Sequence, residues 1–266
     1  MPTVVCAEND PRVADMRRRL DDFYRTTSEY EAFKEVSIQT MFWGPVIDEI
    51  RRLASAHPGR RVRILEFGAG RTGFPAALGD LRSRAEIHAQ DVTDQNRDYL
   101  ALHADMVHVG DVLGLTGPYD VIFSTFVWEH VSNPRALLGH VLGMLAPGGS
   151  LFLASPRYDA PGYVPPSARH YGSARQLALL ARLQAARLRT ALGGPPSFLV
   201  HLDPAVLHRP WFRDADAVHW ASIYDLRRAL PRGFALRRLN VATSGWKRWV
   251  WKRFLLLFVH ITKAPG

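Results

Sequence analysis

The chain has a single cysteine, Cys6, among its 266 residues. One thiol excludes an internal disulfide framework and a cluster of thiolate metal ligands, and it fits a reducing compartment. We therefore expect a cytoplasmic protein, and the spacing of the histidines predicts no metal site. The first residues, MPTVVCAENDPRV, lack a basic stretch followed by a long apolar run, so no secretory signal is predicted.

Lysine and long apolar runs are scarce as well. The chain has four lysines, so its formal net charge of +9 is carried almost wholly by arginine. This excess is only a weak indication of an anionic partner. The most apolar segment, residues 254–261, is too short to cross a bilayer, which takes about 20 residues. Because 47% of the residues are hydrophobic, the chain can bury a large core.

From residue 62 onward, short apolar runs alternate with helical stretches. The runs are RVRILEFG, AEIHAQD, DMVHVGD, YDVIFSTF and GSLFLASP, followed near the end by FALRRLNVAT and FLLLFVHITK. This alternation predicts an α/β fold with a parallel sheet, in which ligands bind beyond the carboxyl ends of the strands. We divide the chain into an N-terminal helical cap (1–60), a core (61–156), an inserted lobe (157–222) and a C-terminal helix with the last two strands (223–266).

Two segments outside the core are predicted to be helical from the spacing of their apolar residues. The cap carries Leu20, Phe23, Tyr24, Tyr30 and Phe33 at intervals typical of helices. We expect Pro45 and Pro58 to mark helix ends there, and Tyr24, Tyr30 and Trp43 to be core or lid aromatics. The lobe contains SARQLALLARLQAARLRTAL, an amphipathic helix whose predicted packed face is formed by Leu177, Leu180 and Leu183, with Leu188 and Leu192 further on.

The segment RILEFGAGRTGF (63–74) places G-x-G-x-x-G directly after an apolar run. Gly68 and Gly70 let the backbone turn tightly and approach a ligand without a Cβ in the way. The pattern suits a dinucleotide or S-adenosylmethionine, and a plain strand-to-helix turn is the alternative. Asp91 ends the next run, where a carboxylate can accept ribose hydroxyls of either ligand. Glu66 favours the sulfonium cofactor, because a carboxylate repels a pyrophosphate and attracts an ammonium group.

Asp111 ends the third run, in HVGDV. Its carboxylate can accept a hydrogen bond from an adenine amino group, while Val112 offers its backbone N–H to the ring. Asp111 can equally be a helix N-cap, a position that aspartate favours.

The segment YDVIFSTFVWEHVSNPRALLGHVLGMLAPGGSLFLASP, taken with RILEFGAGRTG, AQD and VGDV in the same order, resembles class I S-adenosylmethionine-dependent methyltransferases. The closest likeness is to the small-molecule group with an E-H-V segment and an L-x-P-G-G turn. The resemblance covers residues 62–156 and more loosely the tail. It implies a Rossmann-like seven-stranded sheet, mostly parallel, with an antiparallel last strand beside the fifth and the lobe inserted between strands 5 and 6.

The resemblance also implies which residues bind S-adenosylmethionine, the expected cofactor. Glu66, Gly68 and Gly70 are expected at the methionine end, Asp91 at the ribose, and Asp111 with Val112 at the adenine. The full set of expected cofactor-binding residues is Glu66, Phe67, Gly68, Ala69, Gly70, Asp91, Val92, Asp111, Val112, Thr125 and Phe126, with Ser124 beside the methyl-donor region. Arg71 departs from the family pattern, and we expect it to face the N-terminal helices or the cofactor carboxylate.

His130, in WEHV, is the best-placed candidate for a catalytic base, since an imidazole accepts a proton near neutral pH. The alternative is a structural role for Glu129 and His130. The lobe histidines His170, His201, His208 and His219 are further candidates, each more simply explained by packing. Asp214 and Asp216 lie near His219 in the sequence, so a cation site formed by these residues is a minor alternative.

The segment GWKRWVWKRFLLLFVH (245–260) combines tryptophans with four cations. It suits a membrane interface, with the 246–258 tail as a peripheral contact, or a hairpin connection covering the sheet edge. Nucleic acid is the less favoured partner, because the fourth strand ends in STFVWEHV rather than in a base-methylation motif. A small-molecule or lipid-linked acceptor is expected.

We therefore predict an S-adenosylmethionine-dependent small-molecule methyltransferase that favours an oxygen acceptor over nitrogen or carbon. An NAD-dependent oxidoreductase with the same glycine loop and a non-catalytic binding module of this fold are the alternatives. The sequence predicts no oligomeric state.

Overall fold

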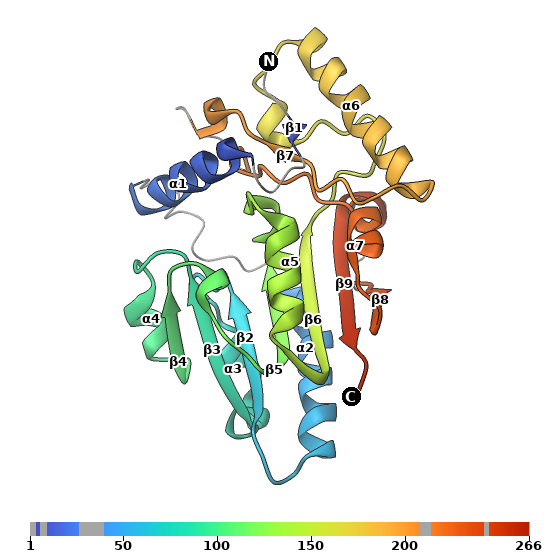
Figure 1. The fold of residues 1–266 in the computed structure, drawn as a ribbon. Coiled ribbons are helices and arrows are strands. Elements are labelled where there is room, and N and C mark those ends of the chain that lie inside the picture. Colours follow the sequence, from blue (N-terminus) through green and yellow to red (C-terminus); the bar gives the residue numbers. More distant parts are fainter. Residues whose placement is uncertain (1–3, 6–9, 27–39, 208–213, 242–244, 266) are drawn as a thin grey trace.

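A computed structural model describes residues 4–5, 10–26, 40–207, 214–241 and 245–265. Its centre is a seven-stranded sheet (Figure 1). The order of the strands across it is β4 (Met106–Val109), β3 (Ala85–Asp91), β2 (Val62–Phe67), β5 (Tyr119–Thr125), β6 (Leu145–Pro156), β9 (Leu256–Lys263) and β8 (Phe234–Arg238).

The strand directions match those expected of the fold. β2 pairs in parallel with β3 and β5, β3 pairs in parallel with β4, and β5 pairs in parallel with β6. β9 is antiparallel to both β6 and β8, so the last strand lies beside the fifth. The predicted Rossmann-like sheet is confirmed.

Alternate side chains of the strands build the two faces of the sheet, because successive residues of a strand point to opposite sides. On one face Ile64 packs with Ile50 of α2 (Thr40–Ala56) and with Phe74 of α3 (Phe74–Ala77). On the other face Leu65 belongs to the core cluster of α5 (Pro134–Gly143) and α7 (Ile223–Ala229). Figure 1 shows α5 in front of the sheet and α2 behind it.

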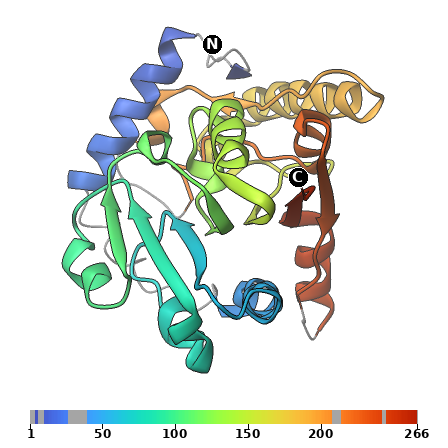
Figure 2. The ribbon, with the colours of Figure 1, turned by 60° about the horizontal axis from the view of Figure 1, so that its bottom comes forward.

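The remaining helices lie at the edge and the top of the sheet in Figure 1. α4 (Arg97–Ala101) packs beside β4. α1 (Pro11–Thr26) lies above the carboxyl ends of the parallel strands, and α6 (Ser173–Ala191) lies beyond it, while Figure 2 shows α2 set apart from both. Short 3₁₀ turns include η4 (Val112–Gly114), η5 (Trp128–His130) and η7 (Pro204–Leu207).

The two helices of the 1–60 segment have different roles. α1 packs on the lobe, where Val13, Met16 and Leu20 contact the cluster that contains Val200 of the small sheet β1 (Val4–Val5) and β7 (Val200–His201). α2 packs under the central sheet instead. Pro45 lies inside α2, so the expectation that it marks a helix end is wrong.

The lobe helix α6 is confirmed, but its predicted packed face is wrong. Leu183 is buried as expected, whereas Leu177 and Leu188 are exposed. The buried positions are Leu179, Leu183, Arg187 and Thr190. Leucines occur around most of this helix, so its partners in the lobe decide which of them are buried. Arg187 is buried because its guanidinium pairs with Asp225 and donates to the carbonyl of Trp220.

Candidate active site

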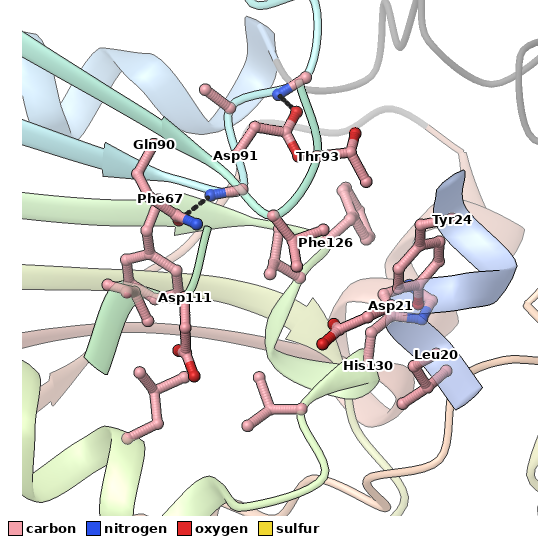
Figure 3. Close-up of a pocket in the computed structure, with 18 of the residues that line it drawn as sticks. Leu20, Asp21, Tyr24, Phe67, Gln90, Asp91, Thr93, Asp111, Phe126 and His130 are labelled. Carbon is pink, nitrogen blue, oxygen red and sulfur yellow. Dashed lines mark hydrogen bonds between the residues drawn. The ribbon is translucent and has the colours of Figure 1, made fainter. Parts of the chain in front are cut away.

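A cavity of about 250 Å³ lies between the carboxyl ends of the parallel strands and α1 (Figure 3). The glycine loop, the ends of β3 and β5, the turn at Asp111 and the stretch around His130 form its walls. α1 closes it from the opposite side with Arg17, Leu20, Asp21 and Tyr24. Most of the predicted cofactor residues line this cavity: Phe67, Gly68, Ala69, Gly70, Asp91, Val92, Asp111, Val112, Thr125 and Phe126.

Two glycines of the loop adopt left-handed backbone angles. Gly68 has φ +66° and Gly70 has φ +54°. A Cβ on Gly68 would lie 2.3 Å from Cγ2 of Val127, so a side chain does not fit there. A Cβ on Gly70 would meet no atom within 4 Å, because that part of the loop borders open space. The loop therefore presents bare backbone to the cavity.

Side chains from the end of β3 hold this loop in place. The backbone N–H of Gly68 donates to Oε1 of Gln90 (3.1 Å), and that of Gly70 donates to Oδ2 of Asp91 (3.1 Å), as the dashed lines in Figure 3 show. Asn96 also donates to Oδ2 of Asp91 (3.3 Å). Burial raises the pKa of Asp91, and the hydrogen bonds that it accepts, first that from Asn96, oppose this rise. Asp91 is thus a fixed acceptor at the cavity wall.

Asp111 was predicted to be an adenine contact or a helix N-cap, and the structure shows that it is an N-cap. Its Oδ1 accepts a hydrogen bond from the backbone N–H of Leu113 at the start of η4 (2.9 Å). Its Oδ2 forms an ion pair with Arg17 of α1. Because Asp111 also lines the cavity, the N-cap role and a ligand contact are compatible.

The end of β5 carries an unusual backbone conformation at Phe126, which has φ +57°. A left-handed conformation of a residue other than glycine costs roughly 1–3 kcal/mol, and such residues cluster at ligand sites. Phe126 is held there by a hydrogen bond from its N–H to the carbonyl of Ala154 (2.8 Å) and by an edge-on contact with Phe42 (5.4 Å between ring centroids).

Glu66 and Ser124 differ from the other predicted residues, because neither is among those that line the cavity. Both side chains are buried, Glu66 at 2% exposure. Burial raises the pKa of Glu66 to about 8, against a hydrogen bond with Thr72 that lowers it. The carboxyl group thus gains a proton near neutral pH, and it lies behind the glycine loop rather than in the cavity wall. Arg71 does line the cavity, with its guanidinium 5.8 Å from the ring centroid of Tyr99.

His130 lines the cavity and is paired with a carboxylate that sequence spacing does not reveal. Its Nδ1 lies 3.1 Å from Oδ2 of Asp216, and Asp216 is 1% exposed. The hydroxyl of Tyr24, on α1, donates to the same Oδ2 (2.9 Å). Figure 3 shows Tyr24 and His130 next to each other at the α1 side of the cavity. Nε2 of His130 is 3.9 Å from Oε1 of Glu129, beyond hydrogen-bonding distance.

This pairing sets the charge of the imidazole. Burial lowers the pKa of His130, but the charge of Asp216 and its hydrogen bond, with a smaller effect of Glu129, raise it to about 10. For Asp216, burial has the opposite effect and raises the pKa. The charge of the His130 imidazolium outweighs burial and keeps the pKa of Asp216 below its usual value. Burial raises the pKa of Glu129 to about 7, with His130 opposing. The pairing with Asp216 therefore favours the imidazolium form of His130.

The histidines of the lobe that the structure describes, His170, His201 and His219, do not line this cavity. His219 is buried, and its Nδ1 lies 2.8 Å from the carbonyl oxygen of Trp128. Burial lowers the pKa values of His201 and His219 to about 4. His208 lies outside the described residues, as do Cys6 and Tyr30. Asp216 pairs with His130 rather than with His219, so the cation site considered for Asp214, Asp216 and His219 has no support.

Within the ranges that the structure describes, no group of three or more His, Cys, Asp or Glu side chains is arranged to hold a metal ion. No helix in the same ranges is long and apolar enough to span a bilayer.

The basic tail forms the connection between β8 and β9, as the hairpin interpretation predicted. It contains α8 (Trp246–Val250) and the π-helical turn η8 (Trp251–Leu255). Trp251 packs against the cluster of Phe42 and Phe258. Trp246 is 72% exposed and Trp249 is 57% exposed, so only part of the aromatic surface covers the sheet.

Comparison with known proteins identifies the family. A family model described as a methyltransferase domain matches residues 34–231. A ubiquinone biosynthesis O-methyltransferase of Parvibaculum lavamentivorans is 31% identical over an alignment of 124 residues, and the match covers 40% of this chain and 48% of that protein. The chain thus spans about half the length of this curated relative.

Solved methyltransferases share the fold at low identity. A plantazolicin methyltransferase in complex with SAH has a TM-score of 0.53 at 10% identity, covering 96% of this chain and 98% of that one. An S-adenosylmethionine-dependent methyltransferase of Mesorhizobium loti has a TM-score of 0.50 at 16% identity, covering 84% and 98%. A 1,6-didemethyltoxoflavin-N1-methyltransferase of Burkholderia thailandensis has a TM-score of 0.50 at 13% identity, covering 94% and 90%.

The family match covers the glycine loop, the ends of the parallel strands and the whole lobe. It favours a methyltransferase domain over the oxidoreductase that the glycine loop left open. The chain belongs to the methyltransferase-domain family, as the resemblance to class I S-adenosylmethionine-dependent methyltransferases predicted.

Proposed function

We propose that the protein transfers a methyl group from S-adenosylmethionine to the oxygen of a small molecule with an acidic hydroxyl, such as a phenol or a carboxylic acid. The observation that carries this proposal is the imidazolium of His130 at the cavity wall, paired with Asp216 through Nδ1 and with Nε2 outside hydrogen-bonding distance of Glu129.

The cavity fits the cofactor in three respects. Bare backbone at Gly68 and Gly70 allows close approach of a ligand. Asp91 is fixed beside this loop, where its carboxylate can accept ribose hydroxyls. Asp111 and Val112 lie at the next turn, where they would flank an adenine. Thr125 and Phe126 would lie near the sulfur. Glu66 would act from behind the loop by supporting its conformation.

Bound S-adenosylmethionine supplies a methyl carbon that is activated by its sulfonium group. The protein's own task is then to align an acceptor oxygen and to manage its proton. Two states of the acceptor and His130 differ only in the position of one proton. In one state the acceptor is an oxyanion beside the protonated Nε2 of His130, and in the other the acceptor keeps its proton and the imidazole is neutral. The pKa of His130, about 10, is close to that of a phenol such as tyrosine, also about 10. A phenol ionises far more readily than an aliphatic alcohol, so a phenolate is the acceptor that the imidazolium of His130 would stabilise.

The oxygen preference is also supported by the curated relative, which is a ubiquinone biosynthesis O-methyltransferase. A nitrogen acceptor fits the site less well. An amine must be neutral to attack, and a neutral amine gains nothing from an imidazolium donor, because its own lone pair is the nucleophile.

A panel with one aromatic frame tests this proposal. Formation of S-adenosylhomocysteine is measured with phenol, benzoate, benzyl alcohol and benzylamine as acceptors. We expect turnover with phenol or benzoate, little with benzyl alcohol, and a loss of roughly 10²–10⁴-fold in His130→Ala. Faster turnover of benzylamine than of phenol and benzoate would show that the acceptor atom is nitrogen.

We further propose that the exposed part of the tail is a peripheral contact with anionic lipid, which would serve a lipid-linked acceptor. Exposed Trp246 and Trp249 suit the headgroup region of a bilayer. Four cations, Lys247, Arg248, Lys252 and Arg253, lie in the same ten residues, and no acidic residue follows Asp225 in the chain. Anionic lipid complements both features.

A further inference from the structure

Three residues that are distant in the sequence meet beside the cavity, which Tyr24 and His130 line and from which Asp216 is buried. Tyr24 comes from α1, His130 from η5 and Asp216 from the loop before α7. The Tyr24 hydroxyl and the Asp216 carboxylate are 192 residues apart and 2.9 Å distant. The rings of Tyr24 and His130 are perpendicular, with centroids 6.3 Å apart. A hydrogen-bonded chain therefore runs from α1 through Asp216 to the imidazole.

Asp216 is held rigidly in a buried turn. The backbone N–H of Val218 donates to the Asp216 carbonyl (2.8 Å), and that of Ala217 donates to the carbonyl of Asp214 (3.1 Å), which has φ +62°. The turn is tied to η5, because His219 N–H donates to the Glu129 carbonyl (2.8 Å). The lobe and η5 thus form one unit around His130. Nδ1 of His130 lies 3.1 Å from the backbone carbonyl oxygen of Asp216 and 3.1 Å from its Oδ2, to which Tyr24 also donates. Among the described residues, Oδ1 of Asp216 has no hydrogen-bond partner.

α1 bridges the two halves of the cavity. Towards the cofactor half, Arg17 pairs with Asp111, and the side chain of Gln95 donates to the backbone carbonyl of Tyr24 (3.0 Å). Towards the lobe, Leu20 packs in the cluster with Val218. The Tyr24 hydroxyl can reach Asp216 only when α1 is seated across both halves.

We infer that Asp216 and Tyr24 are positioning residues: Asp216 orients His130 so that Nε2 faces the acceptor, and Tyr24 makes that orientation depend on α1 closing over the cavity. This inference rests on the proposed function of His130. A carboxylate that orients the ring nitrogen opposite the reacting one fixes both the tautomer and the direction of an imidazole. Binding of the cofactor beneath α1 and readiness of His130 are thereby coupled.

Other titratable groups lie around the same imidazole, so a test must separate Asp216 from them. Glu129 of η5 is 3.9 Å from Nε2 of His130, Asp214 of the loop before α7 acts on Glu129 by its charge, and Asp21 of α1 lines the same cavity. Replacing Asp216 by asparagine removes the charge but preserves the side-chain shape and an acceptor for Tyr24. Glu129, Asp214 and Asp21 keep their charges in this variant.

The lobe offers a matched control, since it holds a second Tyr–Asp–His cluster. Tyr171 donates to Asp203, and its hydroxyl lies 3.2 Å from Nε2 of His201. None of these three residues lines the cavity. Asp203→Asn and Tyr171→Phe remove the same groups as Asp216→Asn and Tyr24→Phe, away from the proposed site.

The decisive experiment is an NMR titration of the histidine side chains, assigned with His130→Gln, together with kinetics using phenol as acceptor. In Asp216→Asn we expect the His130 titration to shift to lower pH by more than one pH unit, and kcat to fall about 10–100-fold with less change in KM. In Tyr24→Phe we expect a shift in the same direction and a smaller fall in kcat. Asp203→Asn and Tyr171→Phe should leave the titration of His130 and kcat unchanged.

An unchanged His130 titration in Asp216→Asn, with S-adenosylhomocysteine still bound, would overturn the role of Asp216. Equal behaviour of Tyr24→Phe and the wild type in both measurements would overturn the link to α1. Failure of phenol and benzoate to accept a methyl group would reject the proposed function alone, since the NMR titration still decides how His130 is positioned.

Discussion

At the residue scale, the site depends on a few backbone and charge features that tolerate little change. Gly68 has room for no side chain beside Val127, and its φ of +66° disfavours any residue but glycine. The buried carboxylate of Asp216 forms an ion pair with the partly buried imidazole of His130. The glycines were recognisable from their spacing in RILEFGAGRTGF, because the G-x-G-x-x-G pattern has a backbone cause. Asp216 was not recognisable as a partner of His130, since the fold alone brings together residues 86 positions apart.

Gly68→Ala should reduce both stability and cofactor binding. The added Cβ meets Val127 at 2.3 Å, and the left-handed conformation alone costs roughly 1–3 kcal/mol for such a residue. Urea denaturation with and without S-adenosylhomocysteine measures both effects. Gly139→Ala is the control, because Gly139 lies exposed within α5 with free space around its Cα, so alanine there should stabilise the helix by up to about 1 kcal/mol. Equal stability of the two variants would contradict the account.

The Asp216–His130 pair predicts how stability depends on pH. The pKa of His130 is raised from 6.5 to about 10, so its contribution to the free energy of unfolding is complete below pH 6.5 and is lost as the pH rises through 10. Because the pKa of Asp216 is lowered in the folded state, this carboxylate adds to the free energy of unfolding at pH values above the ordinary aspartate pKa of 3.8. That contribution is lost as the pH falls below this value. We expect Asp216→Asn to cost about 3–5 kcal/mol near pH 6 and much less at pH 10. Denaturation at both pH values measures the difference, and a cost independent of pH would contradict it.

At the element scale, the strands were predictable because each buried run is short, apolar and bounded by turn residues. AEIHAQD coincides with β3, and the antiparallel placement of β9 matched the expected fold. The buried face of α6 was not predictable, because leucines surround this helix and its partners lie elsewhere in the lobe. The role of α1 was also hidden. Its apolar face gave no sign that it packs on the lobe while α2 packs on the sheet.

The α8–η8 connection should bind anionic vesicles. Trp246→Ala combined with Trp249→Ala removes exposed indoles but no cation, so we expect sedimentation with phosphatidylserine vesicles to weaken at least several-fold. The control is Leu177→Ala combined with Leu188→Ala, which removes two exposed apolar side chains from α6. Binding that is absent in the wild type, or unaffected by loss of the indoles, would exclude a membrane role for this surface.

At the scale of the whole molecule, the cavity lies where the sheet, α1 and the lobe meet. The sheet supplies fixed acceptors and bare backbone at its carboxyl edge, and the lobe supplies Asp216. The sequence allowed the first half of this site to be predicted, because its residues follow their strands directly. The second half depends on contacts between distant segments, so it became visible only in the folded chain.

The central claim is that this cavity binds the methyl donor through Asp91 and the glycine loop. Calorimetric titration with S-adenosylhomocysteine, the demethylated product, tests it most directly. We expect one binding site in the wild type, affinity at least tenfold weaker in Asp91→Ala, and no binding of NAD under the same conditions. Binding of NAD but not of S-adenosylhomocysteine, or equal affinity in Asp91→Ala, would contradict the account.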